Sequence, residues 1–190
     1  MSMVTKGISM FILAVSILLL LVMIVLGFML GFDHPLPWVL IFVLVIIPFI
    51  HDKIIAKRFI KWKDAYSVGI QSIDKDHKKL LGMINQLQTA VHYTTDDAMI
   101  DIILDDLLDY TKYHFSREEE MLQKFNYRDF EQHKHQHETM IAQITKHIEN
   151  YRSSSSHNMN ELTQYLKSWL INHINGCDQE YAPLLRGKVE

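Results

Sequence analysis

Seven residues of this 190-residue chain have the side-chain types of a metal centre, and they are spread over four stretches of the C-terminal two-thirds. They are His77, His114, Glu118, His133, His137, His173 and Asp178. A zinc ion is usually satisfied by four ligands and calcium prefers oxygen ligands, whereas five imidazoles and two carboxylates are what two adjacent iron ions need. If the seven converge, the sequence predicts a di-iron centre.

The spacing of these residues is helical in two of the four stretches. His114 and Glu118 are four residues apart, as are His133 and His137, which places both members of each pair on one helix face. His173 and Asp178 are five apart with Gly176 between them, so a regular helix would not align them. We therefore expect the helix to loosen or bulge near Gly176.

Six further histidines are expected in loops or on the surface rather than at the metal. They are His34, His51, His92, His135, His147 and His157. His135 stands between two candidate ligands but roughly 160–200° around the helix from each of them. Paired histidines arise by chance in histidine-rich chains, so the prediction depends on four helices contributing together.

The regions around the candidates have the apolar periodicity of amphipathic helices, and no region has the pattern of a strand. A turn with an N-cap is expected at 94–97, a short turn at 126–128, and a capping box at Asn158 and Glu161. The predicted fold is all-α, an antiparallel up-down four-helix bundle with metal ligands facing its core. The expected helices run from about 74 to 92, 97 to 125, 129 to 152 and 158 to 175.

Two apolar runs precede this region and predict two transmembrane helices, at about 8–32 and 37–56. Ile8 to Phe32 carries no charge and is long enough, at ~1.5 Å per residue, to cross a ~30 Å hydrocarbon core. The second run is shorter and contains Pro48, which predicts a kink. The alternatives are a signal peptide for the first run and a re-entrant or interfacial segment for the second.

Charge predicts the topology of this pair and excludes one class of partner. Lysine and arginine follow the second run between Lys53 and Lys63, so the positive-inside rule places both termini in the cytoplasm. The rest of the chain holds 13 basic and 20 acidic residues, which argues against nucleic acid. The lone Cys177 fits a reducing compartment. The expected domains are a membrane anchor at 1–60, a globular domain at 62–182 and a tail at 183–190.

The globular region resembles the bacterial hemerythrins over about residues 62–182. The matching positions are Trp62, Val68-Gly69-Ile70, Ile73-Asp74, Asp76-His77-Lys78, His114-Phe115, Glu118-Glu119, Met121, His133, His137-Glu138, Trp169-Leu170, His173-Ile174, Asp178 and Tyr181. The resemblance implies that His133, His137 and His173 bind one iron, that His77 and His114 bind the other, and that Glu118, Asp178 and an oxo or hydroxo group bridge both. The second iron then has one open position, where O2 binds.

The function expected from this resemblance is reversible O2 binding by two iron ions (Fe2+/Fe3+), for O2 storage or delivery at the cell inner membrane. The expected partners are O2, the lipid bilayer and a membrane oxidase or oxygenase. No side chain at the ligand positions is an evident acid or base for O–O cleavage, which favours a binding protein over an enzyme. The alternatives are an O2 or redox sensor acting through a partner, and a di-iron enzyme handling peroxide or nitric oxide.

Overall fold

The computed structural model describes the backbone of residues 3–56, 59–93, 96–153 and 159–189, and within these ranges it leaves out the side chains of 3–10, 13 and 51–56. The chain divides into two compact units, residues 1–59 and 60–190, which are described separately below as unit 1 and unit 2. All regular structure in the described ranges is helical, as the sequence predicts.

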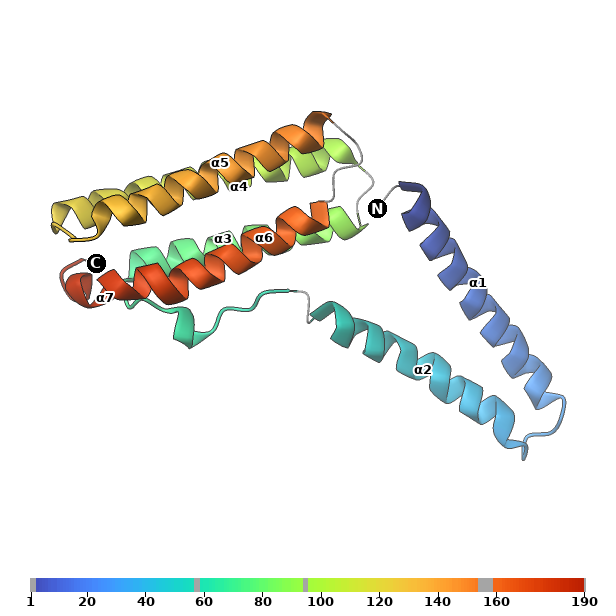
Figure 1. Ribbon diagram of the computed structural model, residues 1–190. Helices are drawn as coiled ribbons and strands as arrows, with labels where there is room; N and C mark the ends of the chain where they lie inside the picture. Colours follow the sequence, from blue (N-terminus) through green and yellow to red (C-terminus); the bar gives the residue numbers. More distant parts are fainter. Residues whose placement is uncertain (1–2, 57–58, 94–95, 154–158, 190) are drawn as a thin grey trace. The chain divides into compact units, whose positions relative to one another are not determined.

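Unit 2 is a bundle of four long helices that alternate in direction (Figure 1). They are α3 (Gln71–Tyr93), α4 (Asp97–Lys124), α5 (Phe130–Ser153) and α6 (Met159–His173). Helix α3 packs against α4 and α6, and α5 packs against the same two helices. The predicted up-down bundle is confirmed, because short connections between amphipathic helices leave antiparallel neighbours as the simplest packing.

The helix ends follow the local signals in the sequence. Asp96 caps α4 by accepting a hydrogen bond from the Ala98 amide at 3.0 Å. At the other end of α4, Asn126 takes a left-handed conformation (φ 52°), and the Tyr127 amide donates to the Leu122 carbonyl at 2.9 Å. The predicted turn at 126–128 and the predicted N-cap before α4 are confirmed. Residues 94–95 of the first predicted turn and Asn158 of the predicted capping box lie outside the described residues.

The helix after α6 contains the predicted irregularity. Residues Ile174–Asp178 form one turn of π-helix, after which α7 (Gln179–Leu185) continues the chain. A π turn holds an extra residue, so it rotates the residues that follow it relative to a regular helix. The expected bulge near Gly176 is therefore confirmed, and it changes the direction in which the Asp178 side chain leaves the helix.

Two apolar clusters stabilise unit 2, and candidate ligands such as His77, Glu118 and Asp178 stand between members of the two clusters in the sequence. The larger cluster includes Leu80, Phe115 and Ile174, and the smaller one includes Ile73 and Tyr181. His77 falls between Ile73 and Leu80, and Asp178 falls between Ile174 and Tyr181. The bundle therefore encloses a band of polar side chains between two hydrophobic regions, which keeps bulk water away from them.

Unit 1 consists of two helices, α1 (Met3–Phe28) and α2 (Pro35–Ala56), where the sequence predicts helices at 8–32 and 37–56. Helix α1 ends before Phe32 because Gly31 adopts φ +118°, and α2 starts directly at Pro35, a residue suited to the first helical position. The Trp38 indole donates to the Phe32 carbonyl at 3.0 Å and closes the turn. Pro48 lies inside α2.

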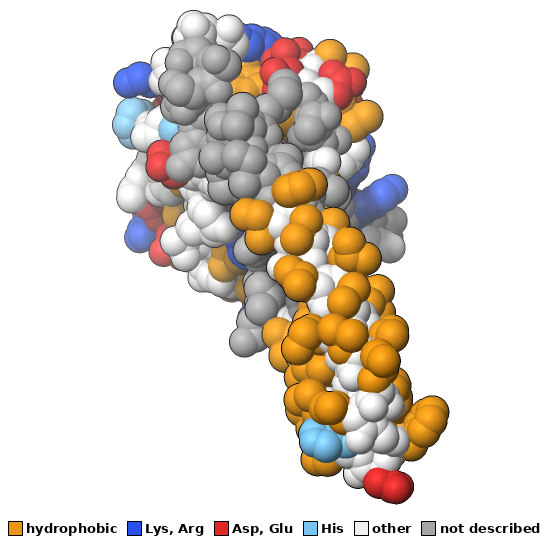
Figure 2. All heavy atoms as spheres, turned by 90° about the vertical axis from the view of Figure 1, so that its right-hand side faces the viewer, with side chains coloured by type: hydrophobic (Ala, Val, Ile, Leu, Met, Phe, Trp, Pro, Cys, Tyr) orange, Lys and Arg blue, Asp and Glu red, His pale blue; other side chains and the backbone are white. Residues whose placement is uncertain are grey.

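The prediction of two transmembrane helices is not confirmed: in the part of the chain that the structure describes, no helix is long and apolar enough to cross a membrane. Hydrophobic side chains nevertheless cover the surface of unit 1, including Phe11, Leu18 and Phe42, each more than 60% exposed (Figure 2).

Candidate metal centre

The bundle brings all seven predicted ligands together in its interior. His77 comes from α3, His114 and Glu118 from α4, His133 and His137 from α5, His173 from the end of α6, and Asp178 from the π turn. None of the seven is more than 4% exposed. Buried polar side chains are costly unless they have partners, so such a cluster needs a compensating interaction.

Asp178 divides its two carboxylate oxygens between two groups of histidines. Its Oδ2 lies 3.2 Å from Nε2 of His77. Its Oδ1 lies 3.2 Å from Nε2 of His173 and 3.8 Å from Nε2 of His133. A carboxylate with one oxygen directed to each group has the arrangement that bridges two cations.

Glu118 lies among the same histidines but divides its oxygens less evenly. Its Oε1 is 3.6 Å from Nε2 of His133. Its Oε2 is 3.5 Å from Nε2 of His114 and 3.6 Å from Nε2 of His137. Glu118 thus contacts both groups of imidazoles, as a second bridging carboxylate would.

The five imidazoles form a group of three and a group of two. The rings of His133, His137 and His173 have centroids 4.5–4.9 Å apart, and the rings of His77 and His114 have centroids 4.9 Å apart. The larger group lies close to Glu118. A ring nitrogen from each of its three histidines and one carboxylate oxygen of Glu118 all lie within 4.8 Å of one another. The division into three and two is the one that the resemblance implies.

Metal ions fit this cluster because its buried polar atoms lack other partners. Among the described residues, neither nitrogen of His77 or His114 and no carboxylate oxygen of Glu118 or Asp178 has a hydrogen-bond partner. Nε2 of His137 and Nε2 of His173 are 3.0 Å apart. Two nitrogens bound to one cation at ~2.1 Å and a right angle would be separated by about 3 Å, so a shared cation fits this pair.

The electrostatics of the two carboxyl groups also favour bound cations. Burial alone raises the pKa of Glu118, but the imidazoles of His133, His114 and His137 outweigh burial and hold this pKa well below its usual range. Burial, and then the charge of Glu118, raise the pKa of Asp178 well above its usual range. Without metal the two carboxyl groups cannot easily both be ionised, and bound cations would allow it.

Burial keeps most of the imidazoles neutral, which is the form that binds a metal. It lowers the pKa of His173 to about 2 and lowers that of His77. The pKa of His137 is also lowered by burial, although Glu119 opposes the shift. His133 is the exception, because its contact with Glu118 outweighs burial and raises its pKa. The site therefore holds lone pairs ready for cations rather than protons.

Several contacts around the ligands were not expected from the sequence. The ring of Phe115 stacks on His137 at 3.7 Å, and the ring of Trp169 stacks on His173 at 4.4 Å. Nδ1 of His137 lies 2.9 Å from Glu119 Oε1, which orients this imidazole so that Nε2 is free for a metal. The sequence signal that could have identified Glu119 is its position directly after Glu118, which places it on the neighbouring face of the helix.

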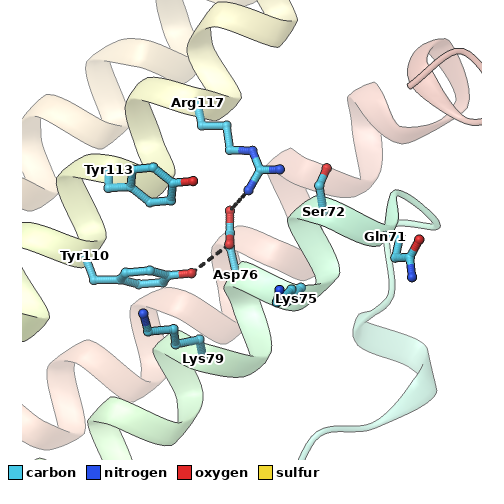
Figure 3. A pocket seen from close by; sticks show the side chains of 8 residues that line it. All are labelled: Gln71, Ser72, Lys75, Asp76, Lys79, Tyr110, Tyr113 and Arg117. Atoms are coloured by element: carbon cyan, nitrogen blue, oxygen red, sulfur yellow. Dashed lines mark hydrogen bonds and ion pairs between the residues drawn. The ribbon is translucent and has the colours of Figure 1, made fainter. Parts of the chain in front are cut away.

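Asp76 lies beside Nδ1 of His114, as Glu119 lies beside Nδ1 of His137. Its carboxylate Oδ2 lies 3.7 Å from Nδ1 of His114 and accepts a hydrogen bond from Arg117 at 3.0 Å, while Oδ1 accepts one from the Tyr110 hydroxyl at 2.7 Å (Figure 3). Asp76 is 3% exposed, so this carboxylate connects a buried ligand to two residues near the surface. Sequence reasoning missed it because Tyr110 and Arg117 belong to another helix.

Tyr181 is a further buried neighbour of the site. It is completely buried, its ring centroid is 5.6 Å from that of His133, and its hydroxyl has no hydrogen-bond partner among the described residues. Burial, and then the charges of Glu118 and Asp178, raise its pKa well above the usual value. Its phenol therefore keeps its proton at neutral pH.

The other histidines lie where the sequence places them, as far as they are described. His34 and His135 are exposed, and His92 and His147 are partly exposed. His51 and His157 lie outside the residues whose side chains are described. Cys177 is half-buried and donates through Sγ to Gln136 Oε1 at 3.0 Å.

Comparison with known proteins agrees with this site. The family model described as the hemerythrin HHE cation binding domain matches residues 68–185. A bacteriohemerythrin of Stenotrophomonas maltophilia is 33% identical over 67% of this chain and 82% of its own length, and one of Clostridium acetobutylicum is 30% identical over 63% and 96%. A crystal structure of wild-type hemerythrin matches with a TM-score of 0.63 and 29% identity, covering 67% of this chain and 98% of that one. With its ligand-bearing bundle and these relatives, the chain belongs to the hemerythrin family.

Proposed function

We propose that unit 2 binds O2 reversibly at a centre of two iron ions held by the seven buried residues. The observation that carries the proposal is the division of five buried imidazoles into three and two around two buried carboxylates, each of which contacts both groups. His133, His137 and His173 would hold one ion, and His77 and His114 the other. The second ion would have one protein ligand fewer, which would leave room for O2. Iron bound in the ferrous state would supply the electrons for O2 binding.

The surrounding side chains suit a small apolar ligand. A cavity of about 20 Å³ lies in the bundle beside Phe115 and Trp169, the two rings that stack on His137 and His173. Most of the other residues that line it are aliphatic, such as Leu80 and Leu166. An apolar surrounding favours O2 over water and protects ferrous ions from oxidation.

The site offers little for breaking the O–O bond. Such a reaction needs a group that gives up a proton near neutral pH. The buried phenol of Tyr181 keeps its proton because its pKa is raised well above the usual value. The imidazoles would be occupied by metal, so we infer binding rather than turnover of peroxide or nitric oxide.

The test is optical. Protein loaded with two irons per chain and reduced without air should develop a visible charge-transfer band when air is added, and the band should vanish under argon. The His135→Ala variant, which changes an exposed histidine, should behave like the wild type. Two bound irons with a spectrum that air does not change would exclude O2 binding.

We also propose that unit 1 attaches the O2 site to the cytoplasmic face of a membrane. The support is the number of large hydrophobic side chains exposed on α1 and α2, since soluble monomers rarely expose apolar patches of such extent. O2 dissolves well in hydrocarbon, so a nearby bilayer would supply it. A membrane oxidase or oxygenase is then the expected recipient.

A further inference from the structure

An open cleft of about 700 Å³ lies on the surface of unit 2 between α3 and α4 (Figure 3). Its lining includes three cationic side chains, Lys75, Lys79 and Arg117, and a single carboxylate, that of Asp76. Lys75 and Lys79 are exposed, and Nζ of Lys79 lies 3.8 Å from the centre of the Tyr110 ring. The cleft is therefore a cationic surface with an aromatic wall.

This charge is opposite to that of the unit around it. Residues 60–190 contain 15 lysines and arginines against 20 aspartates and glutamates, so unit 2 is acidic as a whole. A local cationic surface on an acidic protein orients an approaching anionic partner toward one place. The exposed ring of Tyr113 and the Arg117 side chain also line the cleft, and tyrosine and arginine are enriched in protein interfaces.

The floor of the cleft is connected to the proposed iron site. Asp76 is bound by Tyr110 and Arg117 on the cleft side and lies 3.7 Å from Nδ1 of His114 on the interior side. His114 belongs to the pair of imidazoles assigned to the O2-binding ion. A partner in the cleft would thus be separated from that ion by two side chains, a short path for an electron.

We propose that this cleft docks an acidic one-electron donor protein, which returns the oxidised centre to the ferrous state. This inference rests on the proposed function, because O2 binding needs ferrous ions and oxidised protein must be reduced again. Two reduced donors each lose one electron, and the two ferric ions gain one each. The oxo bridge takes one proton from solvent and becomes a hydroxo bridge.

The probe is an acidic plant-type [2Fe–2S] ferredoxin, whose potential of about −400 mV makes it a strong one-electron donor. Without air, the rate at which reduced ferredoxin bleaches the ferric spectrum and the calorimetric Kd of the complex are measured at low and high salt. The charge-reversed variant carries Lys75→Glu and Lys79→Glu. The control carries Lys134→Glu and Lys146→Glu on α5, which does not line the cleft and gives the same net charge.

We expect the cleft variant to lower the second-order rate and weaken the complex at least tenfold at low salt, with the control close to wild type. The difference should disappear at about 1 M salt, where charges are screened within ~3 Å. Equal effects in both variants, or no reduction of the wild type by ferredoxin, would overturn the docking site. Iron content and the air-dependent band are measured first, so a failure of O2 binding is distinguished from a failure of docking.

Discussion

Asp178, like Glu118, is completely buried, and neither of its carboxylate oxygens has a hydrogen-bond partner in the described part of the chain. Histidines lie on both sides of it at 3.2 Å. A cation on each side would replace the lost solvation of both oxygens. The burial of this carboxylate is thus understandable in the loaded protein and costly in the metal-free one.

The variant Asp178→Ala should lose one bridge and bind iron at least tenfold more weakly, so that purified protein holds clearly fewer than two irons per chain. Metal analysis measures this directly. Asp129→Ala, which removes a partly exposed carboxylate beside Arg128, is the matched control and should keep both irons. Full occupancy in Asp178→Ala would contradict the bridging role.

The buried histidines should make the stability of the metal-free domain depend on pH. The pKa values of His77, His137 and His173 are lowered by burial, so below the ordinary value of 6.5 the unfolded chain binds protons that the folded chain refuses. Each group then costs roughly 1.4 kcal/mol of stability per pH unit between 6.5 and its folded pKa. Asp178 acts in the opposite direction, because its raised pKa lets the folded chain bind a proton in this range. It therefore offsets the cost of about one of the three histidines.

We therefore expect metal-free protein in chelator to unfold at lower urea concentration at pH 5 than at pH 7. His133 does not reverse this trend, because its raised pKa affects stability mainly above 6.5. The measurement is a pair of urea titrations followed by circular dichroism. Equal or greater stability at pH 5 would show that the imidazoles are not kept neutral by the fold.

The π turn at Ile174–Asp178 is the element that places the last ligand. His173 and Asp178 are five residues apart, and the extra residue of the π turn lets both side chains reach the same cluster. Each residue of a regular α-helix turns the chain by about 100° around the helix axis. Without the extra residue of the π turn, the Asp178 side chain would therefore point about 100° away from the cluster. The turn therefore aligns Asp178 with His173 in the buried cluster.

Inserting one alanine after Asn175 should rotate Asp178 about 100° out of the cluster, because the π turn absorbs only one extra residue, and should lower iron content while α3 to α6 stay helical. Gly176→Ala is the matched control, because an added Cβ there meets nothing within 4 Å and the glycine is not at positive φ. This variant should bind two irons like the wild type. Iron content and circular dichroism measure both, and an iron-replete insertion variant would refute the geometric role of the turn.

The two units of the molecule are separate in their packing and in the chemistry of their surfaces. Unit 2 has its own apolar clusters and contains every candidate ligand. Unit 1 exposes much of its hydrophobic surface, as Figure 2 shows. With the functions proposed above, such a division would separate O2 binding in unit 2 from membrane attachment through unit 1.

A chain of residues 60–190 should therefore fold alone and bind two irons, yet stay in the supernatant when sedimented with phosphatidylcholine vesicles. The full chain should sediment with the vesicles because it buries the apolar surface of α1 and α2 in lipid. Vesicle sedimentation followed by iron analysis of both fractions tests this. A full chain that remains with the soluble fraction would rule out the membrane attachment proposed above.

The sequence alone determined the helices of the bundle and the seven candidate ligands that the fold buries together. Apolar periodicity and capping residues act locally, so the four helices, the Asp96 cap and the bulge near Gly176 were predictable. The i, i+4 spacing on α4 and α5 fixed which side chains share a helix face. His77 has no periodic partner, so its prediction as a ligand depended on the other three helices contributing candidates as well.

Only the tertiary structure decided what happens between the helices. The stacking of Phe115 on His137, the unequal contacts of Glu118 and the link from Asp76 through Arg117 to the surface depend on how each helix is rotated against its neighbour. No local signal encodes that rotation, because it results from packing the whole core. The same packing produced the cationic cleft between α3 and α4.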